Sequence, residues 1–280
     1  MVEALTSDRV LAALRSDGFL KFKAFETVAR TTQNAFQAAE QFFQLPINEK
    51  MRNRLPNDTG YRPYGIEYSQ VAERPDQVES FTVSHRIPSS ANQLHADEAK
   101  ALSEEMFVLF DLLEYIAEQI VVGLARELSN DAVAETFCGA FRSWSLLQLN
   151  SSHPVGSPSD CVNDLHEDGC LITLMSNTGP GLEVLSSDNK FTPITIARGE
   201  LLLAPGEILS LLSGGEIRPL YHRVRLVPDG NRRMAMMFFG DIDPRLCQPW
   251  ISNHTNRNVD IGDRVLKNSK RYGLTEWIME

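Results

Sequence analysis

The sequence predicts a mainly β fold, a sandwich or barrel that is backed by helices from its N-terminal part. Before residue 140, apolar residues recur at helical spacing over long segments. After residue 140, short apolar runs alternate with turn signals, which is typical of β-sandwiches and barrels. The chain has 280 residues, 42% of them hydrophobic, without an internal repeat or a low-complexity linker, so we expect a single domain over 1–280.

Three helices and one strand are predicted in the N-terminal part. Ser7 can cap a first helix that ends at Gly18, because glycine adopts the left-handed conformation that closes helices. A short strand is expected over 19–22. The second helix runs over about 26–44 and is stopped by a following proline, and the third runs over about 97–128. The apolar stripe of the third helix is wide enough to pack against a sheet.

The rest of the chain is predicted to consist of loops and short strands. Residues 56–96 contain no clear helix and are interrupted by prolines and glycines. The tail from 248 onward is polar, with a short helix expected near 259–271. The predicted strands of the C-terminal half are 143–150, 170–175, 181–185, 191–196, 200–204, 207–212, 220–227 and 233–239.

Composition excludes several classes of function. The net charge of −10, from 27 Lys and Arg against 37 Asp and Glu, repels phosphate backbones, so we expect no nucleic-acid partner. No window approaches the ~20 apolar residues of a membrane span, and the first residues do not resemble a signal peptide. The four cysteines lack CxxC spacing. Together these features predict a cytoplasmic protein with reduced thiols.

One group of residues indicates metal chemistry. His166 and Asp168 are two positions apart, so on an extended backbone they project to the same side. His222 comes from a distant predicted strand of the same barrel and would complete a set of two nitrogens and one oxygen. Such a set leaves about three octahedral positions open and suits non-haem Fe(II) chemistry with O₂. A His-x-Asp triplet is a common pattern, so its surroundings decide its meaning.

Motifs on both sides of this group occur in a recognisable order. They are Gly-Phe-Leu (18–20), Phe-Phe-Gln-Leu-Pro (42–46), Gly-Tyr (60–61), Asp-Gln-Val-Glu-Ser-Phe (76–81), Leu-Gln-Leu-Asn (147–150), His-Glu-Asp-Gly-Cys-Leu-Ile-Thr-Leu (166–174), Gly-Leu-Glu-Val-Leu (181–185), Ile-Ala-Arg-Gly-Glu-Leu-Leu-Leu-Ala-Pro-Gly-Glu (196–207), His-Arg-Val (222–224) and Arg-Arg-Met-Ala-Met-Met-Phe-Phe (232–239). In this order the sequence resembles the isopenicillin N synthase-like branch of the 2-oxoglutarate/Fe(II)-dependent oxygenases, over nearly the whole chain.

The resemblance implies a domain plan. The core would be a double-stranded β-helix of the jelly-roll type over 141–245. A mostly helical portion over 1–140 would back this core, with a substrate-side loop at 56–96. Residues 246–280 would form a C-terminal tail or lid.

The resemblance also implies roles for individual residues. His166, Asp168 and His222 match the iron ligands and are therefore the implied catalytic and metal-binding residues. Arg233 matches the arginine that grips the distal carboxylate of 2-oxoglutarate, which a guanidinium fork binds through two hydrogen bonds. Arg232 is the alternative, because strand alternation lets only one of the two face inward.

The chain departs from the family pattern beside this arginine. Ala235 stands where the family has a serine, and Ser152 stands where its Asn-x-Tyr motif has the tyrosine, while Asn150 is retained. Asn150 and Ser152 are therefore expected to border the 2-oxoglutarate site. Losing two neutral hydrogen bonds, each worth about 1 kcal/mol, would weaken binding without abolishing it.

The implied function is that of an Fe(II)- and 2-oxoglutarate-dependent oxygenase. It would hydroxylate, desaturate or cyclise a small molecule, a specialised metabolite or amino-acid derivative, with release of succinate and CO₂. Asp168 occupies the position that a halide would need, which argues against halogenation. Two points stay open: Cys170 faces the iron or is a buried thiol, and the segment with Tyr61, Arg62, Tyr64 and Glu67 contacts substrate or only packs.

Three other functions compete with this one. An Fe(II) oxidase of the same family would not use 2-oxoglutarate, and the changes at Ser152 and Ala235 favour it. A non-catalytic jelly-roll module with a vestigial metal site is opposed by the complete ligand set. A zinc hydrolase could use the same ligands, but no general base presents itself nearby.

Overall fold

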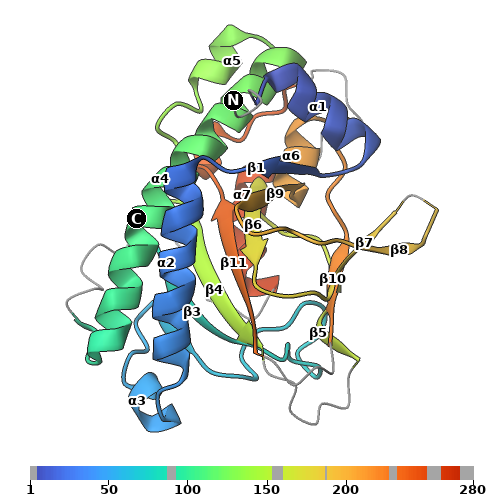
Figure 1. Ribbon diagram of the computed structural model, residues 1–280. Coiled ribbons are helices and arrows are strands. Elements are labelled where there is room, and N and C mark those ends of the chain that lie inside the picture. The colour runs from blue at the N-terminus through green and yellow to red at the C-terminus, as the bar shows by residue number, and fades with distance from the viewer. Residues whose placement is uncertain are drawn as a thin grey trace.

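The computed structural model describes residues 5–86, 93–152, 160–186, 188–226, 232–250 and 260–271. Two antiparallel sheets face each other, and helices cover the outer side of the larger one (Figure 1). The larger sheet has the strand order β1 (Leu20–Lys23), β9 (Glu200–Pro205), β6 (Ile172–Asn177), β11 (Arg233–Gly240), β4 (Leu146–Ser152), β3 (Glu79–Val83) and β2 (Gly60–Arg62). The smaller has the order β5 (Cys161–His166), β10 (His222–Arg225), β7 (Leu182–Leu185) and β8 (Phe191–Pro193).

The helices lie around the larger sheet. Figure 1 shows α2 and α4 side by side along strands β3, β4 and β11, and the β7–β8 hairpin extending away on the opposite side. This arrangement confirms the predicted mainly β fold with flanking helices. The helices are α1 (Ser7–Ser16), α2 (Glu26–Phe43), α3 (Ile47–Met51), α4 (Asp97–Leu128), α5 (Asp131–Glu135), α6 (Glu207–Leu212), α7 (Ile261–Arg271) and a 3₁₀ turn, η2 (Pro244–Leu246).

Strand alternation divides the apolar side chains into two cores. On β9, Leu202 and Ala204 point between the sheets, where they belong to the same cluster as Val184 of β7. Leu201 and Leu203 of the same strand point the other way and pack in the helix-side core. Because successive strand residues face opposite sides, one strand serves both cores.

Aromatic side chains join the helices to the larger sheet. Phe42 of α2 is fully buried, with its ring 5.1 Å from that of Phe81 in edge-to-face geometry. Phe110 of α4 meets Phe238 of β11 in the same way at 5.1 Å. Such pairs add about 0.5–1.5 kcal/mol beyond the area that they bury. The predicted stripe of the third helix therefore packs on the sheet as expected.

The helix boundaries agree closely with the prediction. The first helix begins at Ser7, so the predicted cap at Ser7 is wrong by one residue: Thr6, with extended backbone, is the N-cap residue. It closes before Gly18, whose φ of 80° lies in the left-handed region that favours glycine. The C-terminal helix begins at Ile261, two residues after the predicted start.

One predicted strand is wrong and several strands were missed. Residues 207–212 form helix α6, because Ile208, Leu209 and Leu212 are buried together at helical spacing, which an alternating strand could not achieve. Strands β2, β3 and β5 lie outside the predicted runs. They are short and carry few apolar residues, so periodicity alone does not reveal them.

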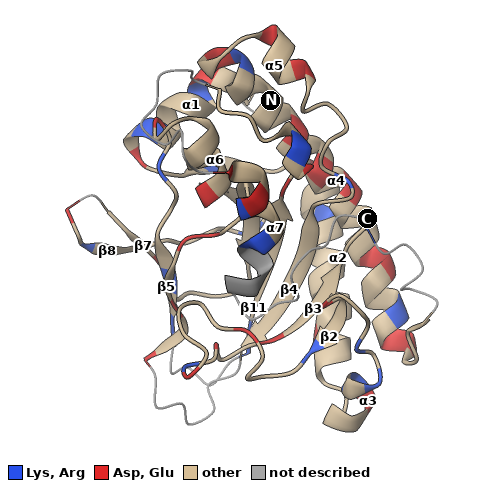
Figure 2. Ribbon diagram, turned by 180° about the vertical axis from the view of Figure 1, so that it is seen from behind, with Lys and Arg blue, Asp and Glu red and all other residues tan. Residues whose placement is uncertain are grey.

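The charged side chains are dispersed over the described surface. Figure 2 shows acidic and basic segments interspersed along α4, without a continuous basic band on that side of the described chain. Within the described residues, none of the helices is both long and apolar enough to cross a membrane.

Candidate active site

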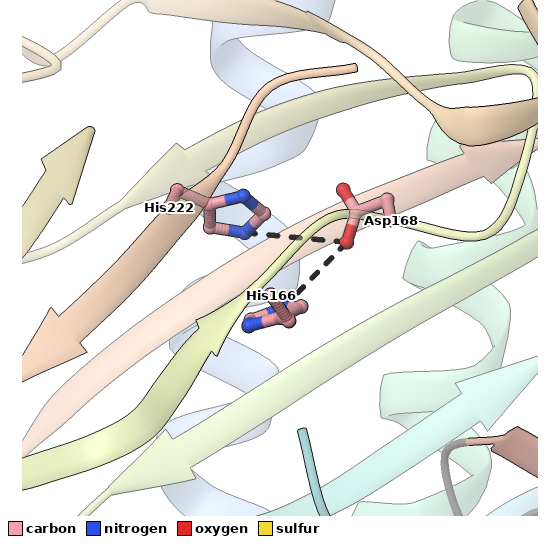
Figure 3. Close-up of side chains that lie close together, drawn as sticks. All are labelled: His166, Asp168 and His222. Atoms are coloured by element: carbon pink, nitrogen blue, oxygen red, sulfur yellow. Dashed lines mark ion pairs between the residues drawn. The ribbon is translucent and has the colours of Figure 1, made fainter. Parts of the chain in front are cut away.

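The three predicted metal-binding residues lie together at the mouth of the two-sheet core. In the pairing of β5 with β10, His222 stands directly opposite His166, and Asp168 follows two residues after β5 ends. Asp168 Oδ1 lies 3.8 Å from His166 Nε2 and 4.0 Å from His222 Nε2 (Figure 3). One ligand atom from each residue lies within 4.8 Å of the others, and no second group of this kind occurs among the described residues.

Each imidazole is held in the tautomer that a metal ion needs. His166 Nδ1 donates to the main-chain oxygen of Asp164 at 2.7 Å, and His222 Nδ1 donates to that of Leu220 at 3.1 Å. A proton on Nδ1 leaves the lone pair of Nε2 free, and both Nε2 atoms face Asp168. Burial, together with the neighbouring His166, lowers the pKa of His222 and so favours its neutral form.

The carboxylate of Asp168 is also oriented by a hydrogen bond. The Thr173 hydroxyl on β6 donates to Asp168 Oδ2 at 2.5 Å, which leaves Oδ1 directed at the two imidazoles. Thr173 is fully buried, so water does not compete for this bond. Two imidazole nitrogens and one carboxylate oxygen then face one point, as a ferrous ion with open coordination positions requires.

A cavity of about 170 Å³ extends from this group along the inner face of the larger sheet. Every second residue of β11 borders it, whereas Met234, Met236 and Phe238 are buried on the helix side. Arg233 therefore faces the cavity, and Arg232 is not among the lining residues. The cavity-facing residues of β11 are Arg233, Ala235, Met237 and Phe239.

One end of the cavity contains the positively charged guanidinium of Arg233. Arg233 donates from Nε to the main-chain oxygen of Pro180 at 2.9 Å, and no carboxylate of the described residues pairs with its guanidinium. Burial lowers the pKa of Arg233 to about 10, so the group stays charged at neutral pH. A partly buried cation without a counter-ion favours an anionic ligand, and its two terminal nitrogens suit a carboxylate.

The two other predicted co-substrate residues lie beside Arg233 and Ala235. Ser152 pairs with Arg233, and Asn150 pairs with Ala235, in the register between β4 and β11. Both border the cavity. The Ser152 hydroxyl donates to the main-chain oxygen of Arg233 at 3.2 Å, so it ties the two strands together.

A chain of hydrogen bonds orients the amide of Asn150. Arg62 is 3% exposed and donates to Gln148 Oε1 at 2.6 Å. Gln148 Nε2 in turn donates to Asn150 Oδ1 at 2.7 Å and to Glu67 Oε2 at 2.8 Å. Because a guanidinium can only donate, Gln148 must turn its oxygen to Arg62 and its nitrogen to Asn150. The amino group of Asn150 is thereby left for the cavity.

The other end of the cavity is mostly apolar. Trp144, Leu146, Phe239 and Val265 of α7 line it, and one carboxyl group, that of Asp241, lies among them. Burial raises the pKa of Asp241 well above its usual range, and its Oδ1 accepts only from the Ile242 amide among the described residues, at 3.1 Å. This end can enclose an apolar body and offers one polar group for orientation.

Helix α7 is fastened beside this apolar end. Arg264 forms a two-pronged ion pair with Glu207 of α6, with Nη2 to Oε1 at 2.8 Å. Val265 on the same helix lines the cavity.

The structure shows where the residues with open roles lie, both in the loop and after Asp168. Tyr61 is fully buried and donates to Glu79 at 2.8 Å, so it packs in the core, and Tyr64 is 42% exposed. Glu67 borders the cavity. Arg62 does not border it, but it donates a hydrogen bond to Gln148, which does. Cys170 borders the cavity, but its buried thiol lies against Ile172 and Thr173 and does not belong to the group of His166, Asp168 and His222.

Sequence reasoning missed several polar residues of the site. Gln148 could have been found by stepping two positions along a strand from Asn150, since such residues share a face. Thr173, Asn177 and Asp241 gave no such signal, because their roles depend on contacts with distant segments. Among the missed residues are Gln148, Thr173, Asn177 and Asp241, and further polar side chains that border the cavity are Ser69, Asp76, Asn163 and Ser176.

Two family models match the chain. The model described as non-haem dioxygenase in morphine synthesis N-terminal matches residues 3–104. The model described as 2OG-Fe(II) oxygenase superfamily matches residues 145–241, which include the whole ligand group and Arg233.

Curated relatives extend over nearly the whole chain. The 2-oxoglutarate-dependent dioxygenase caaD of Aspergillus niger is 25% identical over 276 residues, which cover 92% of this chain and 83% of the relative. Clavatol oxidase claD of Penicillium crustosum is 22% identical over 306 residues, covering 96% and 89%.

Solved structures share the fold. A full-length Neurospora crassa protein, crystallised with alpha-KG and thymine, superposes with a TM-score of 0.78 at 20% identity, covering 93% of this chain and 89% of that one. A 2OG-Fe(II) oxygenase family protein of Caulobacter crescentus gives a TM-score of 0.73 at 22% identity, covering 92% and 91%. The isopenicillin N synthase-like branch stays a prediction within these results. The chain belongs to the 2-oxoglutarate/Fe(II)-dependent oxygenase superfamily, and Fe(II) and 2-oxoglutarate, predicted from the sequence, are the cofactors of that family.

Proposed function

We propose that this chain is a dioxygenase that oxidises a small molecule with Fe(II), 2-oxoglutarate and O₂. The observation that carries the proposal is the charged Arg233, which lies without a carboxylate partner among the described residues in the cavity beside the two-histidine, one-carboxylate group. One cavity thus combines a metal donor set with a cation suited to the far end of a dicarboxylate.

Each residue has a distinct task in this proposal. His166, Asp168 and His222 hold Fe(II) through Nε2, Oδ1 and Nε2. Arg233 binds the distal carboxylate of 2-oxoglutarate, and the amino group of Asn150 faces the same ligand. Bound Fe(II) and 2-oxoglutarate supply the oxidising reactivity, with succinate and CO₂ as products.

The apolar end of the cavity is proposed to receive the substrate. Trp144, Leu146 and Phe239 would enclose an apolar body and exclude water, and the carboxyl group of Asp241 would orient one polar substituent. Val265 places helix α7 at this end, so the C-terminal segment is proposed as a lid over a single oxygenase domain. A specialised metabolite or amino-acid derivative fits such a site, and hydroxylation, desaturation and ring closure are the reactions proposed.

A second function is favoured by the two residues beside Arg233 that differ from the family pattern. Ala235 and Ser152 remove two of the three groups that the family resemblance assigns to the distal carboxylate. An oxidase of the same superfamily that binds iron but not 2-oxoglutarate would need none of them.

An anaerobic titration distinguishes the two. Fe(II)-loaded protein is titrated with 2-oxoglutarate while the visible metal-to-ligand charge-transfer band is followed. We expect the band to grow in the wild type and to be absent in His222→Ala, with His85→Ala as a control because His85 pairs with Asp111 outside the site. Fe(II) binding without a band would refute 2-oxoglutarate use and favour the oxidase. Succinate release over a panel of small molecules then identifies the substrate.

A further inference from the structure

The floor of the cavity near Arg233 contains a row of side chains that crosses three strands. Ala235 of β11 pairs with Asn150 of β4 on one side and with Asn177 of β6 on the other. Residues directly opposite in antiparallel strands point to the same face, and all three border the cavity. Ala235, the position without the expected hydroxyl, is thus flanked by two amides.

The two amides differ in what they can offer a ligand. The oxygen of Asn150 is engaged by Gln148 at 2.7 Å, so one end of this amide is committed. The side chain of Asn177 makes no hydrogen bond to any described residue, although Asn177 is only partly exposed. An amide in such a place can donate to a ligand without first losing another partner.

The position of Arg233 favours the Asn177 side. Its Nε donates to the main-chain oxygen of Pro180, three residues after Asn177 in the chain. This bond places the guanidinium beside the turn that follows β6. A carboxylate held by the terminal nitrogens would therefore lie near the end of β6.

We propose that the side-chain amide of Asn177 donates a hydrogen bond to the distal carboxylate of 2-oxoglutarate held by Arg233, in place of the hydroxyl that Ala235 lacks. The inference rests on the proposed function, because it assumes that 2-oxoglutarate binds. It makes Asn177 a binding residue that distinguishes a 2-oxo dicarboxylate from a 2-oxo acid with an uncharged tail.

The test is an equilibrium titration without turnover. Anaerobic Fe(II) protein is titrated with 2-oxoglutarate and, separately, with 2-oxopentanoate, which keeps the keto acid but lacks the distal carboxylate. Asn177→Ala is expected to raise the Kd for 2-oxoglutarate about fivefold to tenfold and to leave the Kd for 2-oxopentanoate and for Fe(II) unchanged. Asn177→Asp should raise the first Kd further, since it sets a second negative charge beside the carboxylate.

Restoring the missing hydroxyl gives a second, independent readout. Ala235→Ser should recover most of the lost affinity in the Asn177→Ala background and change the wild type less. Asn177 also borders a second cavity of about 390 Å³ beside α2, which Gln33 lines as well, so Gln33→Ala controls for effects of that cavity.

The outcomes separate the inference from the function on which it rests. Equal losses for both keto acids, or unchanged binding of both, would overturn the role of Asn177 while 2-oxoglutarate use stands. Wild-type protein that binds Fe(II) and gives no band with 2-oxoglutarate would instead refute the proposed function itself.

Discussion

Two parts of the cavity differ in how far their residues depart from the family pattern. The proposed metal end consists of His166, Asp168 and His222. The proposed anchor end is the part that would bind the distal carboxylate of 2-oxoglutarate, and it consists of Arg233, Ala235, Asn150 and Ser152. At the metal end, His166, Asp168 and His222 are all present, and each is directed at one point. At the anchor end, only Arg233 and Asn150 match, whereas Ala235 and Ser152 do not. The difference follows from chemistry. A metal ion needs particular donor atoms in fixed geometry, whereas a carboxylate accepts hydrogen bonds from many directions and from many groups.

The two ends are also supported differently. The imidazoles are oriented by main-chain oxygens of Asp164 and Leu220, which no substitution at those positions removes. Asn150 is oriented by side chains, through Gln148 and Arg62. The metal end is therefore tied to the backbone fold, and the anchor end is open to replacement residue by residue.

Among the substitutions that test this difference between the two ends, the one at Arg233 is expected to have the largest effect on binding. Arg233→Ala should raise the Kd for 2-oxoglutarate roughly 10- to 100-fold, because a hydrogen bond to a charged group contributes about 1.5–3 kcal/mol. Fe(II) affinity should stay within about twofold of the wild type, as the ligand group is untouched. Both constants come from anaerobic titration. Arg232→Ala is the matched control, and an equal loss in that variant would reverse the assignment of the anchor.

A smaller effect is expected from a substitution at the metal end that removes the hydrogen bond orienting Asp168. Thr173→Val keeps the shape of the side chain but removes the bond to Asp168 Oδ2. Groups that orient metal ligands are worth about 10- to 100-fold in affinity, and we expect a value near the lower limit for Fe(II) binding. Calorimetry under argon measures it.

Ser176→Ala on the same strand is the control for that substitution, since the Ser176 hydroxyl makes no hydrogen bond to the described residues. If Thr173→Val bound Fe(II) as tightly as this control, the orienting role of Thr173 would be wrong.

The smallest effect on 2-oxoglutarate binding is expected from a substitution at Gln148, which orients Asn150 of the anchor end. Gln148→Leu removes one neutral hydrogen bond to Asn150, so the Kd for 2-oxoglutarate should rise about threefold to fivefold. Thr82→Val also removes a partner of Arg62 and only a long contact of 3.5 Å to Gln148 Oε1, and it leaves the bond from Gln148 to Asn150 in place, which makes it the control. Equal effects in the two variants would mean that 2-oxoglutarate binding depends on the placement of Arg62 and not on the hydrogen bond from Gln148 to Asn150.

Local sequence patterns predicted the long helices of this protein and the residues proposed as its metal ligands. The long helices follow from apolar residues at helical spacing, and His166 with Asp168 follows from a spacing of two on an extended chain. The chemistry of two imidazoles and a carboxylate could also be inferred before any fold was known. The same patterns failed at 207–212, where a short apolar run is compatible with either a strand or a helix.

Only the tertiary structure decided how these parts meet. The register between β5 and β10 sets His222 opposite His166, and the register of β11 turns Arg233 to the cavity. Strand pairing depends on contacts between segments far apart in the chain, and a shift of one residue would reverse every side chain. For the same reason the sequence alone did not single out Asn177, because its neighbour Ala235 lies on another strand and its significance comes from what that neighbour lacks.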